Sequence, residues 1–112
     1  MREWRAKEPA SIAKRIIEGE VAEAGYKVEK VILFGSRARR ENTRASDWDF
    51  LAVVGGKMGR KERLALVQRI RRKLAKLGID ADIILKSREE FEEQVKDVGM
   101  IAYYAAKEGV AV

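Results

Sequence analysis

Acidic residues inside two apolar segments are the side chains best suited to chemistry in this chain. Asp47 and Asp49 stand one residue apart at the head of the apolar run 48–54. Residues two apart in a strand project to the same face, so these carboxylates are expected to lie side by side. Neighbouring carboxylates repel each other unless a cation or a proton lies between them. Either Asp47 caps a loop and Asp49 sits at a solvated strand end, or the pair binds a cation.

A third acid favours a metal site. Asp82 lies among apolar neighbours in DADIILK, within an expected strand over 79–86, where an unpaired charge is costly. Oxygen ligands from two adjacent strands, in a chain without His or Cys, suit a hard divalent cation such as Mg²⁺. Asp80 has the same strand parity and competes for this role. We prefer Asp82, because Asp80 closely follows Gly78 and can be an ordinary strand-start residue.

A possible anion site precedes the acids. Gly35 and Ser36 follow the apolar run 28–34, and a glycine leaving a strand before a helix-opening serine lets backbone N–H groups approach a phosphate. Gly-Ser alone is a generic turn, but beside the acids it predicts a pocket for phosphate and metal. Surface arginine is common, yet at least one of the loop arginines is expected to contact phosphate. These are Arg37, Arg39, Arg40 and Arg44.

The hydrophobic pattern predicts the elements that position these residues. Expected in order are a helix from Pro9 to Gly25, strand 28–34, a short helix from Ser36 to 40 or 41, loop 42–46, strand 48–54, helix 60–77, strand 79–86, a capped helix from about 88, and helix 100–108 after Gly99. The stripe of helix 60–77 is expected to comprise Leu64, Val67, Ile70, Leu74 and Leu77. The fold class is α/β (α+β), a single domain over 1–112 with a small mixed sheet flanked by helices.

Composition narrows the function classes. The 112 residues carry a net charge of +6, which favours anionic partners. The absence of Cys and His excludes disulfides, thiol nucleophiles and imidazole ligands. No apolar run approaches the length of a membrane span and the N-terminus does not resemble a signal peptide, so we expect a cytoplasmic location and no membrane partner.

The compound pattern resembles a known superfamily. Gly35-Ser36, ten residues, then Asp47-Trp48-Asp49 is similar to the G-S-x10-D-x-D signature of polymerase β-like nucleotidyltransferases. FGSRAR followed by SDWDF resembles their small stand-alone branch, the minimal nucleotidyltransferase (MNT) domains, and the resemblance extends through Asp82 to the C-terminal segment IAYYAAKEGVAV. Arg40 replaces a frequent glycine and Trp48 a smaller aliphatic residue, so local geometry is expected to differ there.

The resemblance implies a site and a reaction. Asp47, Asp49 and Asp82 would be catalytic and would bind Mg²⁺, two ions being expected, with Asp82 helping to activate an attacking hydroxyl. Gly35 and Ser36, with Arg37 or Arg39, would bind the triphosphate of ATP. The hydroxyl would attack the α-phosphate and pyrophosphate would leave, with charge neutralised by the metals.

The resemblance also implies a partner. MNT proteins resemble one half of a pair whose other half is a HEPN-domain toxin, which the MNT half neutralises by binding it and transferring AMP to a tyrosine. Alternatives are an antitoxin that binds nucleotide and inhibits sterically, and a basic nucleic-acid-binding module, for which the sequence carries no recognised motif. A homo-oligomer or hetero-oligomer is possible. The basic face of helix 60–77 is expected to be solvated, and the tail 103–112 either docks a partner or completes the core.

Overall fold

The computed structural model describes residues 2–35 and 48–112, with side chains from Pro9 onward. Four strands form one sheet in the order β3-β2-β1-β4. They are β1 (Lys27–Phe34), β2 (Trp48–Gly55), β3 (Ala81–Ser87) and β4 (Val110–Ala111). β1 is antiparallel to both β2 and β4, whereas β2 and β3 are parallel. The predicted small mixed sheet is therefore confirmed.

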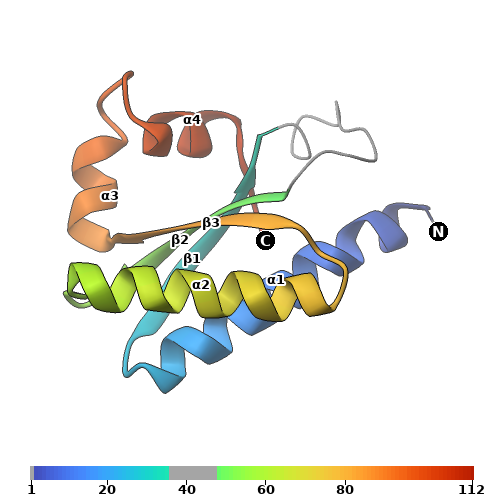
Figure 1. The fold of residues 1–112 in the computed structure, drawn as a ribbon. Coiled ribbons are helices and arrows are strands. Elements are labelled where there is room, and N and C mark those ends of the chain that lie inside the picture. The colour runs from blue at the N-terminus through green and yellow to red at the C-terminus, as the bar shows by residue number, and fades with distance from the viewer. Residues whose placement is uncertain (1, 36–47) are drawn as a thin grey trace.

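Helices cover both faces of this sheet (Figure 1). One face carries α1 (Arg2–Glu23) and α2 (Arg60–Lys76), and the other carries α3 (Arg88–Gln94) and α4 (Ile101–Glu108). The period-two alternation of β2 supplies both cores: Phe50 and Ala52 join the cluster with α1 and α2, while Leu51 and Val53 join the cluster with α4. Because both faces of β2 are buried, its sequence is almost continuously apolar.

The ends of two helices follow their sequence signals. Gly78 has φ +78° and donates to the Ala75 carbonyl at 3.0 Å, while the Ile79 amide reaches Leu74 at 2.9 Å. These two hydrogen bonds form a Schellman motif, which ends α2 at the position predicted from Gly78. At the start of α3, Ser87 and Glu90 form the predicted capping box.

The predicted buried stripe of α2 is partly wrong. Ile70 and Leu74 are buried as expected, but Leu64 is 60% exposed and Leu77 58%, and Leu66 takes the inner position instead. Leu66, Ile70 and Leu74 follow an i, i+4 spacing that faces the sheet, whereas Leu64 lies on the outer side of the same turn. Because α2 carries apolar residues on both its inner and its outer side, the hydrophobic periodicity alone assigned Leu64 to the buried side incorrectly.

The start of α1 and the start of β3 also differ from the predictions. α1 begins at Arg2 and runs through Pro9, because the preceding residues are mostly good helix formers. Pro9 then costs one backbone hydrogen bond inside the helix rather than opening it. β3 begins at Ala81, so Asp80 precedes the strand, although its carbonyl accepts a 3.0 Å bond from the Trp48 amide.

The basic residues of α2 are more than a solvated face. Lys73 and Arg69 both bind Glu20 of α1, the latter at 3.2 Å, and Glu20 is the buried charged residue of the described chain. The Lys73 hydrogen bond, followed by that of Arg69, holds the pKa of Glu20 below its ordinary value against the opposing effect of burial. Arg63 and Arg71 instead reach the edge strand β3, donating to the carbonyls of Leu85 at 3.2 Å and Ala81 at 3.0 Å.

Candidate active site

The sheet brings two of the predicted acids together. Asp49 of β2 is the register partner of Asp82 of β3, one position inside the start of each strand. Neighbouring strands lie about 4.8 Å apart, and side chains at paired positions project to the same face. That face is the one which α3 and α4 cover further along the strands, since Leu51 and Ile84 pack there. Asp49 and Asp82 thus lie at the end of this face where β1 finishes and β2 and β3 begin.

Gly35 lies against the first of these acids. Phe34 pairs with Asp49 across β1 and β2, and Gly35 follows with φ +78°. A Cβ atom placed on Gly35 would lie 2.3 Å from Oδ2 of Asp49. Only glycine fits there, for both its backbone angle and this close approach. Gly35, the first residue of the predicted phosphate turn, therefore lies next to Asp49, one of the predicted metal ligands.

Asp82 is not the buried charge that its apolar neighbours suggested. Its side chain is 54% exposed, and Oδ1 lies 3.5 Å from Nη2 of Arg71. β3 is an edge strand, so a residue near its start can reach water even when the residues around it are apolar. The expected cost of burial does not apply, and Asp82 is available to a ligand. Sequence reasoning missed Arg71, which had looked like one more basic residue on a solvated helix face.

Asp80 has a different position from Asp82. It is exposed, precedes β3 and lines a surface groove next to α2 rather than the face that carries Asp49. The register that places Asp82 beside Asp49 gives Asp80 no partner on β2 among the paired positions of the two strands. This placement supports the preference for Asp82 as the third acid.

Trp48 is accommodated on the helix-packed face, as the alternation of β2 predicted. It is 9% exposed and stacks on Phe50 with ring centroids 6.2 Å apart and an interplanar angle of 4°. Its neighbour Asp49 consequently projects to the opposite face. The larger aromatic side chain therefore fills core space and helps to fix the orientation of the acid beside it.

The remaining predicted site residues lie outside the described part of the chain. They are Ser36, Arg37, Arg39 and Asp47, together with Arg40, Arg44, the short helix after Ser36 and the loop 42–46. Within residues 2–35 and 48–112, no group of three or more potential metal ligands is found. Asp49 and Asp82 nevertheless provide carboxylate oxygens on one face of adjacent strands, which is a donor set suited to Mg²⁺.

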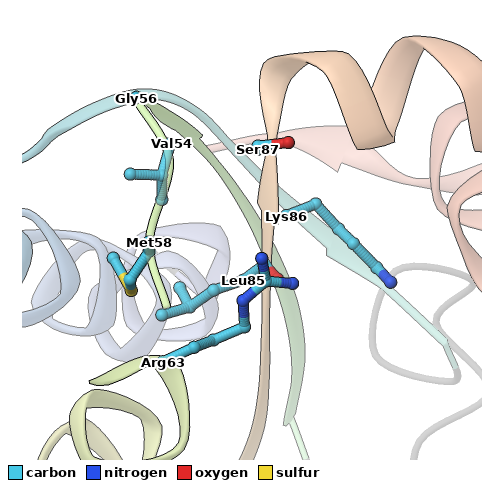
Figure 2. Close-up of a pocket in the computed structure, with 7 residues that line it drawn as sticks. All are labelled: Val54, Gly56, Met58, Arg63, Leu85, Lys86 and Ser87. Atoms are coloured by element: carbon cyan, nitrogen blue, oxygen red, sulfur yellow. The ribbon is translucent and has the colours of Figure 1, made fainter. Parts of the chain in front are cut away.

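A small cavity at the far end of the sheet is a poor substrate site. It has a volume of about 10 Å³ and lies between the ends of β2 and β3 and the start of α2. Figure 2 shows the Arg63 guanidinium beside Leu85 at this cavity, while Lys86 projects away from it. Such a volume holds at most one water molecule. The sheet face at Asp49 and Asp82 remains the candidate active site.

Membrane insertion through a helix finds no support in the described residues. None of their helices combines the length and the apolar character that a transmembrane span requires.

Comparison with known proteins identifies the family. The profile described as polymerase beta, nucleotidyltransferase matches residues 11–108. A search of curated proteins gives no significant match. Among solved structures, a candidate nucleotidyltransferase from Sulfolobus solfataricus is 28% identical, with 90% of this chain and 76% of that chain covered and a TM-score of 0.59. A toxin-antitoxin structure with AMP-PNP is 20% identical, with 75% and 59% covered and a TM-score of 0.45. The chain belongs to the polymerase beta nucleotidyltransferase family.

Proposed function

We propose that the protein is a Mg²⁺-dependent nucleotidyltransferase that transfers AMP from ATP to a hydroxyl group of a partner protein. The observation that carries this proposal is the register of Asp49 with Asp82, with Gly35 against Asp49. The family match supports the reaction class. Bound Mg²⁺ would supply positive charge that offsets the triphosphate and the charge developing during transfer.

Each candidate site residue would have a defined part in the proposed reaction. Asp49 and Asp82, with Asp47, would hold the metal, and the backbone at Gly35 would approach the phosphates because it has no side chain. Asp82 would accept the proton of the attacking hydroxyl. The hydroxyl oxygen forms a bond to the α-phosphorus, the bond from that phosphorus to the bridging oxygen breaks, and pyrophosphate leaves. Positioning and charge neutralisation would do most of the work.

The partner we propose is a HEPN-domain toxin, with a tyrosine as the acceptor and this chain as its antitoxin. The proposal is supported by the resemblance of FGSRAR and SDWDF to MNT domains. The tail 103–112 serves its own fold only in part: Ala105 is buried and β4 pairs with β1, whereas Tyr104 and Val110 are exposed. Steric inhibition without catalysis is the competing explanation of antitoxin action.

Substitution of the acids tests the reaction. Asp49→Asn and Asp82→Asn should each reduce AMP transfer to the HEPN partner at least a hundredfold, because each removes a charge at the reacting phosphate. Asp97→Asn, an exposed aspartate in the turn before α4, is the matched control and should leave transfer unchanged. Transfer is followed with radiolabelled ATP and by the mass added to the partner.

Two further readouts separate the alternatives. Mn²⁺ affinity, measured by electron paramagnetic resonance, should fall in Asp82→Asn and persist in Asp80→Asn; the reverse would transfer the third-acid role to Asp80. If Asp49→Asn abolished AMP transfer yet still neutralised the toxin, antitoxin action would be steric. Undiminished transfer by Asp49→Asn would refute the proposed mechanism.

A further inference from the structure

A groove beside the proposed active site is not used by the function described so far. It has a volume of about 330 Å³ and opens between α2 and the residues leading into β3. Its lining residues are Gln68, Arg71, Arg72, Ala75, Asp80 and Ala81. Arg71 forms a wall shared with the active site, since it donates to the Ala81 carbonyl at 3.0 Å and lies 3.5 Å from Asp82. A ligand that contacts Arg71 in the groove would therefore be one side chain away from Asp82.

The order of the strands indicates on which side of the reacting phosphate the groove lies. Gly35 follows β1, Asp49 lies on β2, Asp82 lies on β3, and the groove lies beyond the start of β3. If phosphates bind at Gly35, as the proposed function has it, pyrophosphate leaves on the β1 side. In phosphoryl transfer the attacking and leaving oxygens lie roughly in line. The attacking hydroxyl then arrives from the β3 side, where the groove opens.

The chemistry of the groove selects an acidic ligand. Arg71 and Arg72 contribute two guanidinium groups and Gln68 an amide. Arg71 is engaged with Asp82, whereas Arg72 forms no ion pair with any side chain in the described residues. Asp80, on the β3 side, would repel an entering carboxylate toward the α2 side, where Arg72 lies. A planar guanidinium pairs well with a carboxylate through two parallel hydrogen bonds.

A nucleic-acid strand suits this groove less well. Single-stranded nucleic acid is held by aromatic side chains that stack on the bases, together with a positive track along the backbone. The lining residues include no aromatic side chain, and the groove has room for a side chain rather than a continuous polymer. We propose that the groove is an acceptor subsite that binds an Asp or Glu side chain flanking the acceptor hydroxyl of a protein, with Arg72 as its principal contact.

Binding of an acidic peptide tests this subsite without nucleotide or metal. The probe is a fluorescein-labelled peptide with one tyrosine between pairs of glutamates, and the comparison peptide has glutamines in their place. Fluorescence anisotropy at low salt should show about tenfold tighter binding of the acidic peptide. Arg72→Glu should weaken it about tenfold, since it replaces an attraction with a repulsion at the contact.

Arg60→Glu is the matched control, because it makes the same charge change on the first residue of α2, outside the groove. It should change the affinity less than twofold, and melting curves should show both variants folded. If Arg72→Glu and Arg60→Glu weakened binding of the acidic peptide equally, the attraction would come from the overall positive charge, and the proposed subsite would be refuted. The lack of acidic preference in the unmodified protein, or tighter Arg72-dependent binding of a labelled oligouridine, would overturn it as well. Since the assay contains no ATP, failure of the proposed reaction would be detected separately by the transfer assay.

Discussion

Substitution of Gly35 by alanine should damage the active site far more than it damages the fold. The new Cβ atom would lie 2.3 Å from Oδ2 of Asp49, whereas ordinary contacts begin at 3.4 Å. The Asp49 carboxylate must therefore move by about 1 Å or more, because the alternative is movement of paired backbone. Displacements of that size in a reacting group can lower a rate about a hundredfold.

Backbone strain adds a smaller effect on stability. At φ +78° an alanine costs roughly 1–2 kcal/mol relative to glycine. For a domain of this size such a loss lowers the melting temperature by about 4–8 °C. Gly78 provides a matched control, since it has the same φ and no atom near its Cβ position. Gly78→Ala should thus lose a similar amount of stability with no effect on the site.

The assays are thermal unfolding and Mn²⁺ binding of both variants, followed by AMP transfer below their melting temperatures. We expect similar melting temperatures, together with weakened metal binding and about hundredfold slower transfer for Gly35→Ala alone. Normal metal affinity and normal transfer in Gly35→Ala would refute the link between this glycine and the position of Asp49. A loss of transfer in Gly78→Ala of the same size would assign the effect to instability.

Two stability predictions concern the side of the sheet that α1 and α2 cover. Glu20→Gln should lower the free energy of unfolding at neutral pH by about 1–3 kcal/mol, because Lys73 and Arg69 lose a charged acceptor while remaining half exposed. Because the folded-state pKa of Glu20 lies below its ordinary value of 4.5, the carboxylate contributes fully to stability above pH 4.5 and loses this contribution as the pH falls further. The free energy of unfolding in urea should therefore depend less on pH in this acid range for Glu20→Gln than for the unmodified protein. Trp48→Ala should cost about 3–5 kcal/mol in urea unfolding and Trp48→Phe much less, because the buried ring packs on Phe50. Comparable losses in both Trp48 variants would mean that the indole itself, rather than an aromatic filler, is required.

Much of the fold could be predicted because its signals are local. Gly78 ends α2 through its positive φ, and Ser87 begins α3 through its side-chain hydroxyl, so each boundary depends on one residue and its near neighbours. The alternation of β2 correctly sent Trp48 and Asp49 to opposite faces. Where two apolar residues competed for one inner position, as Leu64 and Leu66 do, only the packing of α2 on the sheet could decide.

For Asp49 and Asp82 the sequence predicted convergence from two adjacent strands, but not the surroundings of these acids. The apolar runs that contain the acids predicted two strands, and parallel pairing then placed Asp49 beside Asp82. The strand order, which no local pattern encodes, put β3 at an edge and left Asp82 exposed. For the same reason the contact of Arg71 with Asp82 could not be foreseen, since it joins a helix to a strand across that edge.

The arginines that reach β3 also bear on how the protein behaves at high concentration. An edge strand with unpaired carbonyl groups can add a strand from another molecule and begin aggregation. Arg63 and Arg71 occupy two of these carbonyls, at Leu85 and Ala81, and place positive charge along the edge. On the opposite side of the sheet, the two-residue strand β4 pairs with Ile32 and Leu33 of β1. The β3 border of the sheet is thus protected against intermolecular strand pairing, and the same guanidinium group that touches Asp82 contributes to colloidal stability.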